Sequence, residues 1–219
     1  ANAGDSLLVS TDAELFLKGY DYDSTGTNFE WKFDSLAATT QSFKKQDDPQ
    51  TTGYKPLICF GGCATKWNAF TNAELLKDTI NILNVMQLYD IYQFFANTGS
   101  TYEKRMLGFK TDVLGVPMKY TTDFNKNDVV FDFPIAFGNM DTSESSYDIV
   151  IPGLLEYHHW QLRTNHVDGW GSLKTPYGTY ANAIRLKSII YSKDTLELTG
   201  QPPIVIPIDS VVEYKWFDL

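Results

Sequence analysis

Apolar and polar residues alternate with a period of two along much of this chain. Between residues 28 and 34, Phe29, Trp31 and Phe33 alternate with polar neighbours, which is the pattern of a half-buried strand. Similar segments recur at 88–96, 102–110, 129–137 and 211–217, with turn-forming residues between them. About a dozen such segments predict a mainly β protein, built as an antiparallel sandwich or an incomplete barrel.

Residues 169–190 have the clearest hairpin pattern. Gly169, Gly171 and Gly178 supply turn and close-approach positions among apolar strand positions. A further strand pair is expected over 182–198, with a break near 192–194. Pro134 is expected at an edge, a bulge or a strand end, because proline cannot donate a hydrogen bond to a sheet.

One segment favours a helix. Thr71 or Asn72 is a candidate N-cap, and Leu75, Leu76 and Ile80 follow at helical spacing. We therefore expect at most one notable helix, around residues 72–86. No stretch has the composition of a long linker, so residues 1–219 are expected to form a single β-rich domain.

The amino-acid composition excludes some classes of binding partner. The 219 residues are 43% hydrophobic, which is enough for a substantial core. The net charge of −9 argues against a nucleic-acid partner and against an anionic membrane surface. The apolar runs are far shorter than the roughly 20 residues of a spanning helix, so no direct membrane span is expected.

The two cysteines, Cys59 and Cys63, lie in the sequence CFGGC. The glycines allow a small disulfide loop, although its geometry would be tight. Two reduced, buried thiols are the alternative expected in a reducing compartment. The spacing and the absence of suitable partners argue against a redox pair or a zinc site. A disulfide is favoured if the protein is exported.

No motif predicts catalysis, a metal site or a bound cofactor. The histidines are His158, His159 and His166, and the first two would point to opposite faces of a strand. No G-x-S-x-G, G-x-G-x-x-G or P-loop pattern is present. We expect a protein that is not an enzyme. The alternative is a hydrolase with a dispersed site that would have to include His158, Asp132 and Glu213.

The five tryptophans could form a sugar-stacking platform or pack in the core. Trp31 and Trp216 lie in alternating segments, where core packing is expected. Trp170 stands between two glycines at a predicted turn. It is the tryptophan we select as a candidate exposed binding aromatic.

Five segments together resemble a family of exported β-rich proteins from bacteria that use the type IX secretion system. They are residues 24–36, 92–109, 129–138, 169–188 and 213–217. The matching positions are Gly26, Asn28, Trp31, Phe33, Leu36, Phe133, Pro134, Gly138, Gly169, Gly171, Leu173, Pro176, Gly178, Tyr180, Arg185, Lys187, Glu213, Tyr214 and Trp216. The resemblance implies export and a β-rich fold, and none of these motifs is catalytic.

Members of that family commonly continue into a C-terminal sorting domain, whereas this sequence ends at Leu219. The start, ANAGDS, is compatible with a mature N-terminus left after signal-peptide cleavage. The resemblance therefore implies a location in the periplasm or at the cell surface. It also implies a protein partner, most concretely the outer-membrane type IX translocon, whose wide pore a small periplasmic plug or accessory subunit would occlude. The alternative is a surface-exported module that binds glycan or protein and has lost its sorting domain.

Overall fold

A computed structural model describes residues 3–11, 19–55, 67–82, 86–113, 115–206 and 210–218. Within these residues the chain forms strands and one short 3₁₀ helix, η1 (Pro49–Thr51). The strands are β1 (Ser6–Thr11), β2 (Phe29–Lys32), β3 (Thr40–Asp47), β4 (Asn72–Ile82), β5 (Met86–Asn97), β6 (Thr101–Val113), β7 (Val116–Asp132), β8 (Met140–Ile151), β9 (Leu155–Thr175), β10 (Gly178–Leu198), β11 (Ile204–Ile206) and β12 (Ser210–Asp218).

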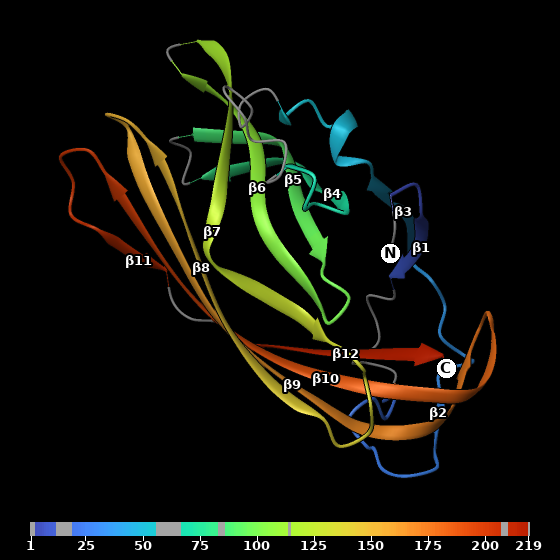
Figure 1. The fold of residues 1–219 in the computed structure, drawn as a ribbon. Helices are drawn as coiled ribbons and strands as arrows, with labels where there is room; N and C mark the ends of the chain where they lie inside the picture. The colour runs from blue at the N-terminus through green and yellow to red at the C-terminus, as the bar shows by residue number, and fades with distance from the viewer. Residues whose placement is uncertain are drawn as a thin grey trace.

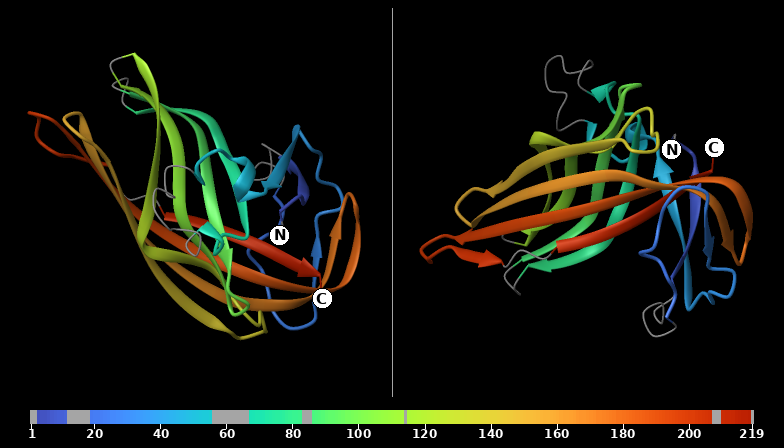
Figure 2. Two further views of the ribbon diagram at one scale, coloured as in Figure 1. Left: turned by 45° about the horizontal axis from the view of Figure 1, so that its top comes forward. Right: turned by 90° about the horizontal axis from the view of Figure 1, so that it is seen from below.

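The strands form a curled sheet that does not close. Its order is β1-β3-β4-β5-β6-β7-β8-β9-β10-β11, and all neighbours along this path are antiparallel. β12 also pairs antiparallel with β10, while β2 adds to β9 as a parallel strand. Figures 1 and 2 show that β8–β12 form one long wall, which curves past the wall made by β4–β7. The predicted mainly β, incomplete-barrel architecture is thus confirmed.

The helix expected around residues 72–86 is absent, so this prediction was wrong. Asn72–Ile82 is strand β4, which pairs with β5 from the Asn72–Phe95 pair to the Ile82–Met86 pair. Asn72 does not cap a helix. Its buried side chain donates to the Tyr102 hydroxyl at 2.8 Å and also bonds Gln46. Pairing with a neighbouring strand outweighs the weak local preference for a helix, because the helix propensities of ordinary residues differ by less than ~1 kcal/mol per residue.

The break expected near residues 192–194 is also absent. β10 runs uninterrupted from Gly178 to Leu198 and pairs with β9 through this region, where Asp194 lies opposite His159. By contrast, the position expected for Pro134 is confirmed, because β7 ends at Asp132. Strand 88–96 and the turn that follows it are confirmed within β5 and its connection to β6.

Apolar side chains gather on both faces of the sheet. The interior core lies between the two walls and joins β5 and β6 to β8, β9 and β10, through residues such as Phe109, Ile149 and Leu196. A second cluster covers the other face of β5 and β6, where Tyr54 and Trp67 are buried. Because both faces of one sheet are covered, long strands can be buried without a second sheet.

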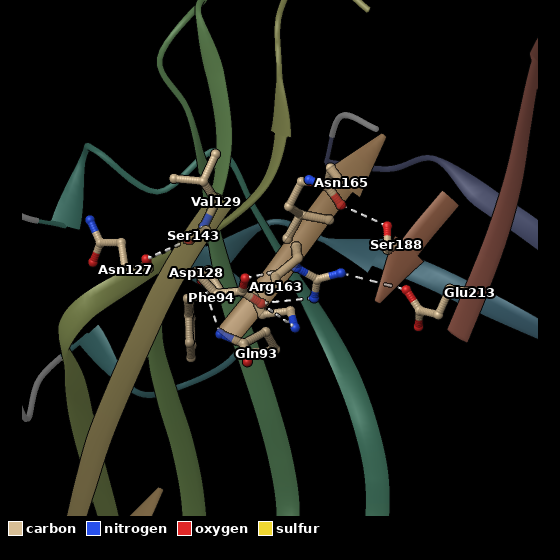
Figure 3. A network of polar contacts seen from close by, with 12 residues as sticks. Gln93, Phe94, Asn127, Asp128, Val129, Ser143, Arg163, Asn165, Ser188 and Glu213 are labelled. Atoms are coloured by element: carbon tan, nitrogen blue, oxygen red, sulfur yellow. Dashed lines mark hydrogen bonds and ion pairs between the residues drawn. The ribbon is translucent and has the colours of Figure 1, made fainter. Parts of the chain in front are cut away.

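The middle of the interior is polar. Arg163 on β9 makes a bidentate ion pair with Asp128 on β7, with Nε–Oδ1 at 2.9 Å and Nη2–Oδ2 at 3.0 Å. Both side chains are almost fully buried, at 3% and 1% exposure. Lys104 on β6 lies 2.8 Å from the Asp128 carboxylate, and Glu213 on β12 lies 3.6 Å from Arg163 Nη1. Figure 3 shows Arg163 between Asp128 and Glu213, so this network ties the two walls together.

These contacts shift the titration of Asp128. Burial alone raises the pKa of the Asp128 carboxyl, but the hydrogen bonds and charges of Arg163 and Lys104 outweigh it and hold the pKa well below its usual range. A carboxyl with a depressed pKa in the folded state stabilises the protein above its unfolded-state pKa of about 4. That stabilisation is lost as pH falls below about 4 towards the folded-state pKa.

We predict that Asp128→Asn lowers the free energy of unfolding at pH 7 by about 3–5 kcal/mol, because it leaves the Arg163 guanidinium buried without its counter-ion. The difference from the wild type should shrink as the pH is lowered below about 4. Denaturant unfolding at a series of pH values measures both effects. Glu144→Gln is the matched control. It breaks the exposed Lys126–Glu144 pair and should cost less than about 1 kcal/mol. Equal losses from the two variants would contradict the prediction.

Candidate functional site

A buried arginine holds residues 22–24 against the outward face of β10. The Arg185 guanidinium pairs with Asp168 on β9, with Nε–Oδ1 at 2.9 Å and Nη2–Oδ2 at 2.8 Å. It also donates to the backbone carbonyls of Tyr22 at 2.7 Å, Asp23 at 3.1 Å and Ser24 at 3.1 Å. Its side chain is fully buried. A buried guanidinium needs this many acceptors, so it fixes the path of the segment before β2.

Aromatic rings surround the same guanidinium. Its carbon lies 4.8 Å from the Tyr214 ring centroid, 5.7 Å from that of Trp31 and 6.0 Å from that of Trp216. Trp31 is itself anchored, because its indole N–H donates to the Ser24 carbonyl at 3.1 Å. Trp216 packs edge-on against Phe33, with ring centroids 5.4 Å apart. Cation–π and edge-to-face contacts thus join β2, β10 and β12 into one cluster.

Two glycines allow the approach of β2 to β9. A Cβ at Gly171 would lie 1.9 Å from the Phe29 carbonyl oxygen, and a Cβ at Gly169 would lie 2.1 Å from Thr25 Oγ1. Both positions lie within β9 and away from its turn, which joins Thr175 to Gly178, so the turn predicted around Gly169, Trp170 and Gly171 is wrong. The close-approach role predicted for these glycines is confirmed, and it is what lets β2 pair in parallel with β9.

Two confluent grooves open over this cluster. One has a volume of about 580 Å³ and is bounded by the β9–β10 turn and residues 36–38. The other has a volume of about 670 Å³ and extends along β12. Leu36 and Trp216 line both grooves, and the aromatic rings of the walls come from Tyr22, Phe33, Tyr177, Tyr180, Tyr214 and Trp216. We call this pair of grooves the Trp216 groove.

The rim of the Trp216 groove carries a small set of charges. Asp23 accepts a hydrogen bond from the Tyr214 hydroxyl, and Lys187 Nζ lies 3.5 Å from Asp23 Oδ1. The Tyr214 hydrogen bond, followed by the charge of Lys187, lowers the pKa of the Asp23 carboxyl. Burial and then Asp23 raise the pKa of the Tyr214 hydroxyl. At neutral pH the rim therefore presents an ionised carboxylate, a neutral phenol and an ammonium group.

Strand β12 borders the groove, and one of its edges has no partner among the described strands. In the described part of the chain, β12 pairs with β10 alone. Val212, Tyr214 and Trp216 alternate along β12 and line the groove, while Val211, Glu213 and Lys215 alternate towards the other face. The groove floor and an edge with free backbone hydrogen-bonding groups therefore lie side by side.

The residues selected from the sequence fall elsewhere. Trp170 is exposed, as expected, but it does not line the Trp216 groove. Trp170 lies opposite Ile184 on β10, and Ile184 faces the interior of the sheet. Cys59 and Cys63 lie outside the described residues, so their predicted disulfide stays a prediction. Sequence reasoning used Leu36 and Tyr214 only in the resemblance, and it expected Trp216 to pack in the core. The alternation of Val212, Tyr214 and Trp216 was the available signal for a shared strand face.

The dispersed His158, Asp132 and Glu213 positions do not converge. His158 Nδ1 lies 2.7 Å from Asp148 on one face of the sheet, and Glu213 lies on the opposite face next to Arg163. His159 points opposite to His158, as expected, and bonds Asp194 at 2.6 Å. No three His, Cys, Asp or Glu side chains gather as a metal site would require among the residues described.

Comparisons with known proteins found no match. No family model, no curated protein and no solved structure matches this chain. In the described ranges, no helix has the length and apolar character needed to cross a membrane.

We predict that Gly171→Ala destabilises the protein by about 1–3 kcal/mol, because the added methyl group overlaps the Phe29 backbone and pushes β2 away from β9. Residues 20–36 should also become more sensitive to proteolysis. Denaturant unfolding and limited proteolysis with mass mapping measure the two effects. Gly178→Ala is the control, because its nearest contact is at an ordinary 3.9 Å and its cost should stay within about 0.5 kcal/mol. A Gly171→Ala variant as stable as the control would refute the close-approach role.

Proposed function

We propose that the protein is a non-enzymatic interaction protein of the bacterial cell envelope, which binds a protein partner at the Trp216 groove. The observation that carries this proposal is the position of the groove along an unpaired edge strand, β12. An extended partner segment would add to the β12 edge through backbone hydrogen bonds and place alternate side chains over the groove. Tyrosine, tryptophan and phenylalanine, which line the walls, are also the residues enriched in the buried centres of protein interfaces.

The most concrete partner is the outer-membrane translocon of the type IX secretion system, for which the protein would be a periplasmic plug or accessory subunit. Support comes from the resemblance of the sequence to exported proteins of that system. Many positions of that resemblance meet in one place, since Trp31, Gly171, Arg185 and Tyr214 all belong to the cluster under the groove. Acting by surface complementarity would require no catalytic group.

A surface module that binds glycan is the second candidate. Tyr177 favours it, because its strongly exposed ring stands beside Pro176 at the mouth of the groove, where a sugar ring can stack. A glycan array with the wild type, Tyr177→Ala and Trp170→Ala distinguishes a glycan site in the Trp216 groove from one at Trp170. Binding lost with Tyr177→Ala places the glycan in the groove, and binding lost with Trp170→Ala places it at the aromatic selected from the sequence. An array without binding removes the glycan candidate.

We predict that Val212→Glu weakens partner binding at least tenfold, because it places a charge on the groove floor beside the free edge. Val211→Glu is the matched control. The two valines are neighbours on β12 with similar exposure, 47% and 50%, but only Val212 lines the groove. Affinity purification of each tagged variant from cell envelopes containing the type IX system, with quantification of the copurified translocon, measures the effect. The wild type and Val211→Glu should recover the translocon in stoichiometric amount.

Two results would contradict the proposal. Absence of the translocon from the wild-type purification would remove the plug or accessory role. Equal recovery with Val212→Glu and Val211→Glu would show that the translocon binds a surface other than the Trp216 groove.

A further inference from the structure

A second cavity lies inside the curled sheet, at the end away from the Trp216 groove. Its volume is about 320 Å³, and strands β4, β5, β6, β8, β9, β10 and β11 contribute to its lining. The inner surface is formed by buried residues of the interior core, including Leu88, Phe109 and Leu196. It therefore continues the apolar interior instead of lying on the outer surface.

The cavity opens where the sheet fails to close. β3 pairs with β4 only at Gln46–Glu74 and Asp47–Ala73, so the rest of β4 lacks a partner on that side in the described chain. Within the described ranges, β11 likewise pairs with β10 alone. Leu76 on β4 and Ile206 on β11 are both exposed and both line the cavity. These two residues form apolar lips at the open seam between β4 and β11.

Among the described residues the lining carries no charged side chain, although the whole chain has 45 Lys, Arg, Asp and Glu residues. Its polar groups are the Asn81 amide and the hydroxyls of Tyr147 and Tyr157. Burial raises the pKa of both tyrosines, which stay neutral. The Tyr157 hydroxyl already interacts with Tyr147 and with Asp194, and Asp194 is bonded to His159. A ligand segment inside the cavity is thus not required to carry a polar or charged group.

We infer that this cavity binds a single acyl chain of an amphiphile, with the chain inside the sheet and the polar headgroup in solvent beyond Leu76 and Ile206. The volume is near the lower end of the range for small-molecule sites, which suits one chain better than two. Apolar cavities of about half this size are poorly hydrated and take up apolar guests. This site is separate from the Trp216 groove and does not depend on the function proposed for it.

Binding of single-chain phosphocholines with 8, 10, 12 and 14 carbons, each below its critical micelle concentration, tests the inference by isothermal titration calorimetry. We expect one saturable site per chain. Its affinity should rise about fourfold for each added methylene, the binding ratio that corresponds to burying one CH₂, and should level off once the cavity is filled. The zwitterionic headgroup has no net charge, so the net charge of the protein does not affect the comparison of chain lengths.

Two pairs of variants locate the binding. Ile206→Glu should weaken binding at least tenfold, while Val205→Glu, at the neighbouring exposed position that does not line the cavity, should leave it within about twofold. Leu76→Glu and Leu75→Glu form the corresponding pair on β4. These positions are exposed, so folding should be retained, and circular dichroism checks it.

Three results would overturn the inference. The first is no binding of any chain length below its critical micelle concentration. The second is an affinity that rises with chain length without levelling off, as expected for adsorption to the outer surface. The third is equal weakening by each lip variant and its neighbour.

Discussion

The buried guanidinium of Arg185 is the contact on which the outward face of the molecule depends. Removing a charge from water is costly unless it is fully paired, and Asp168 together with three backbone carbonyls provides that pairing. Those carbonyls belong to residues 22–24, so the arginine sets the path of the chain before β2. The position of Trp31, the parallel addition of β2 to β9 and the walls of the Trp216 groove follow from that path.

Arg163 has the corresponding role on the inward face of the same β9–β10 ladder. It joins β9 to Asp128 on β7 and approaches Glu213 on β12, so charge pairing crosses the space between the two walls. The interior is divided as a result. A polar middle lies between an apolar cluster near β12 and the apolar end that contains the acyl-chain cavity. Among the described strands, the unclosed sheet also leaves β11 and β12 each with an edge that no other strand pairs with.

The strands could be predicted from the sequence, because period-two alternation and turn residues are visible within a few neighbouring positions. Phe29 and Trp31 follow this pattern, and so does the strand that forms β5, whereas β2 ends at Lys32 and leaves Phe33 outside it. Helical spacing was the wrong guide for residues 72–82. They form strand β4 because they pair with β5, from Phe95 to Met86. Ser192, Lys193 and Asp194 resembled a turn but continue β10, because β9 pairs with all three and β11 also pairs with Asp194.

The sequence by itself determined the β class, the close-approach roles of Gly169 and Gly171, and the burial of Trp31, because each depends on local spacing or on the size of one side chain. Only the tertiary structure decided which polar groups meet. Arg185 reaches residues more than 160 positions earlier, and Arg163 pairs with Asp128 across 35 positions. The curl of the sheet decided that Trp216, Leu36 and Val212 share a groove, and that Leu76 faces Ile206 across an open seam. Such sites are defined by the curvature and register of whole strands, which no short segment of the chain encodes.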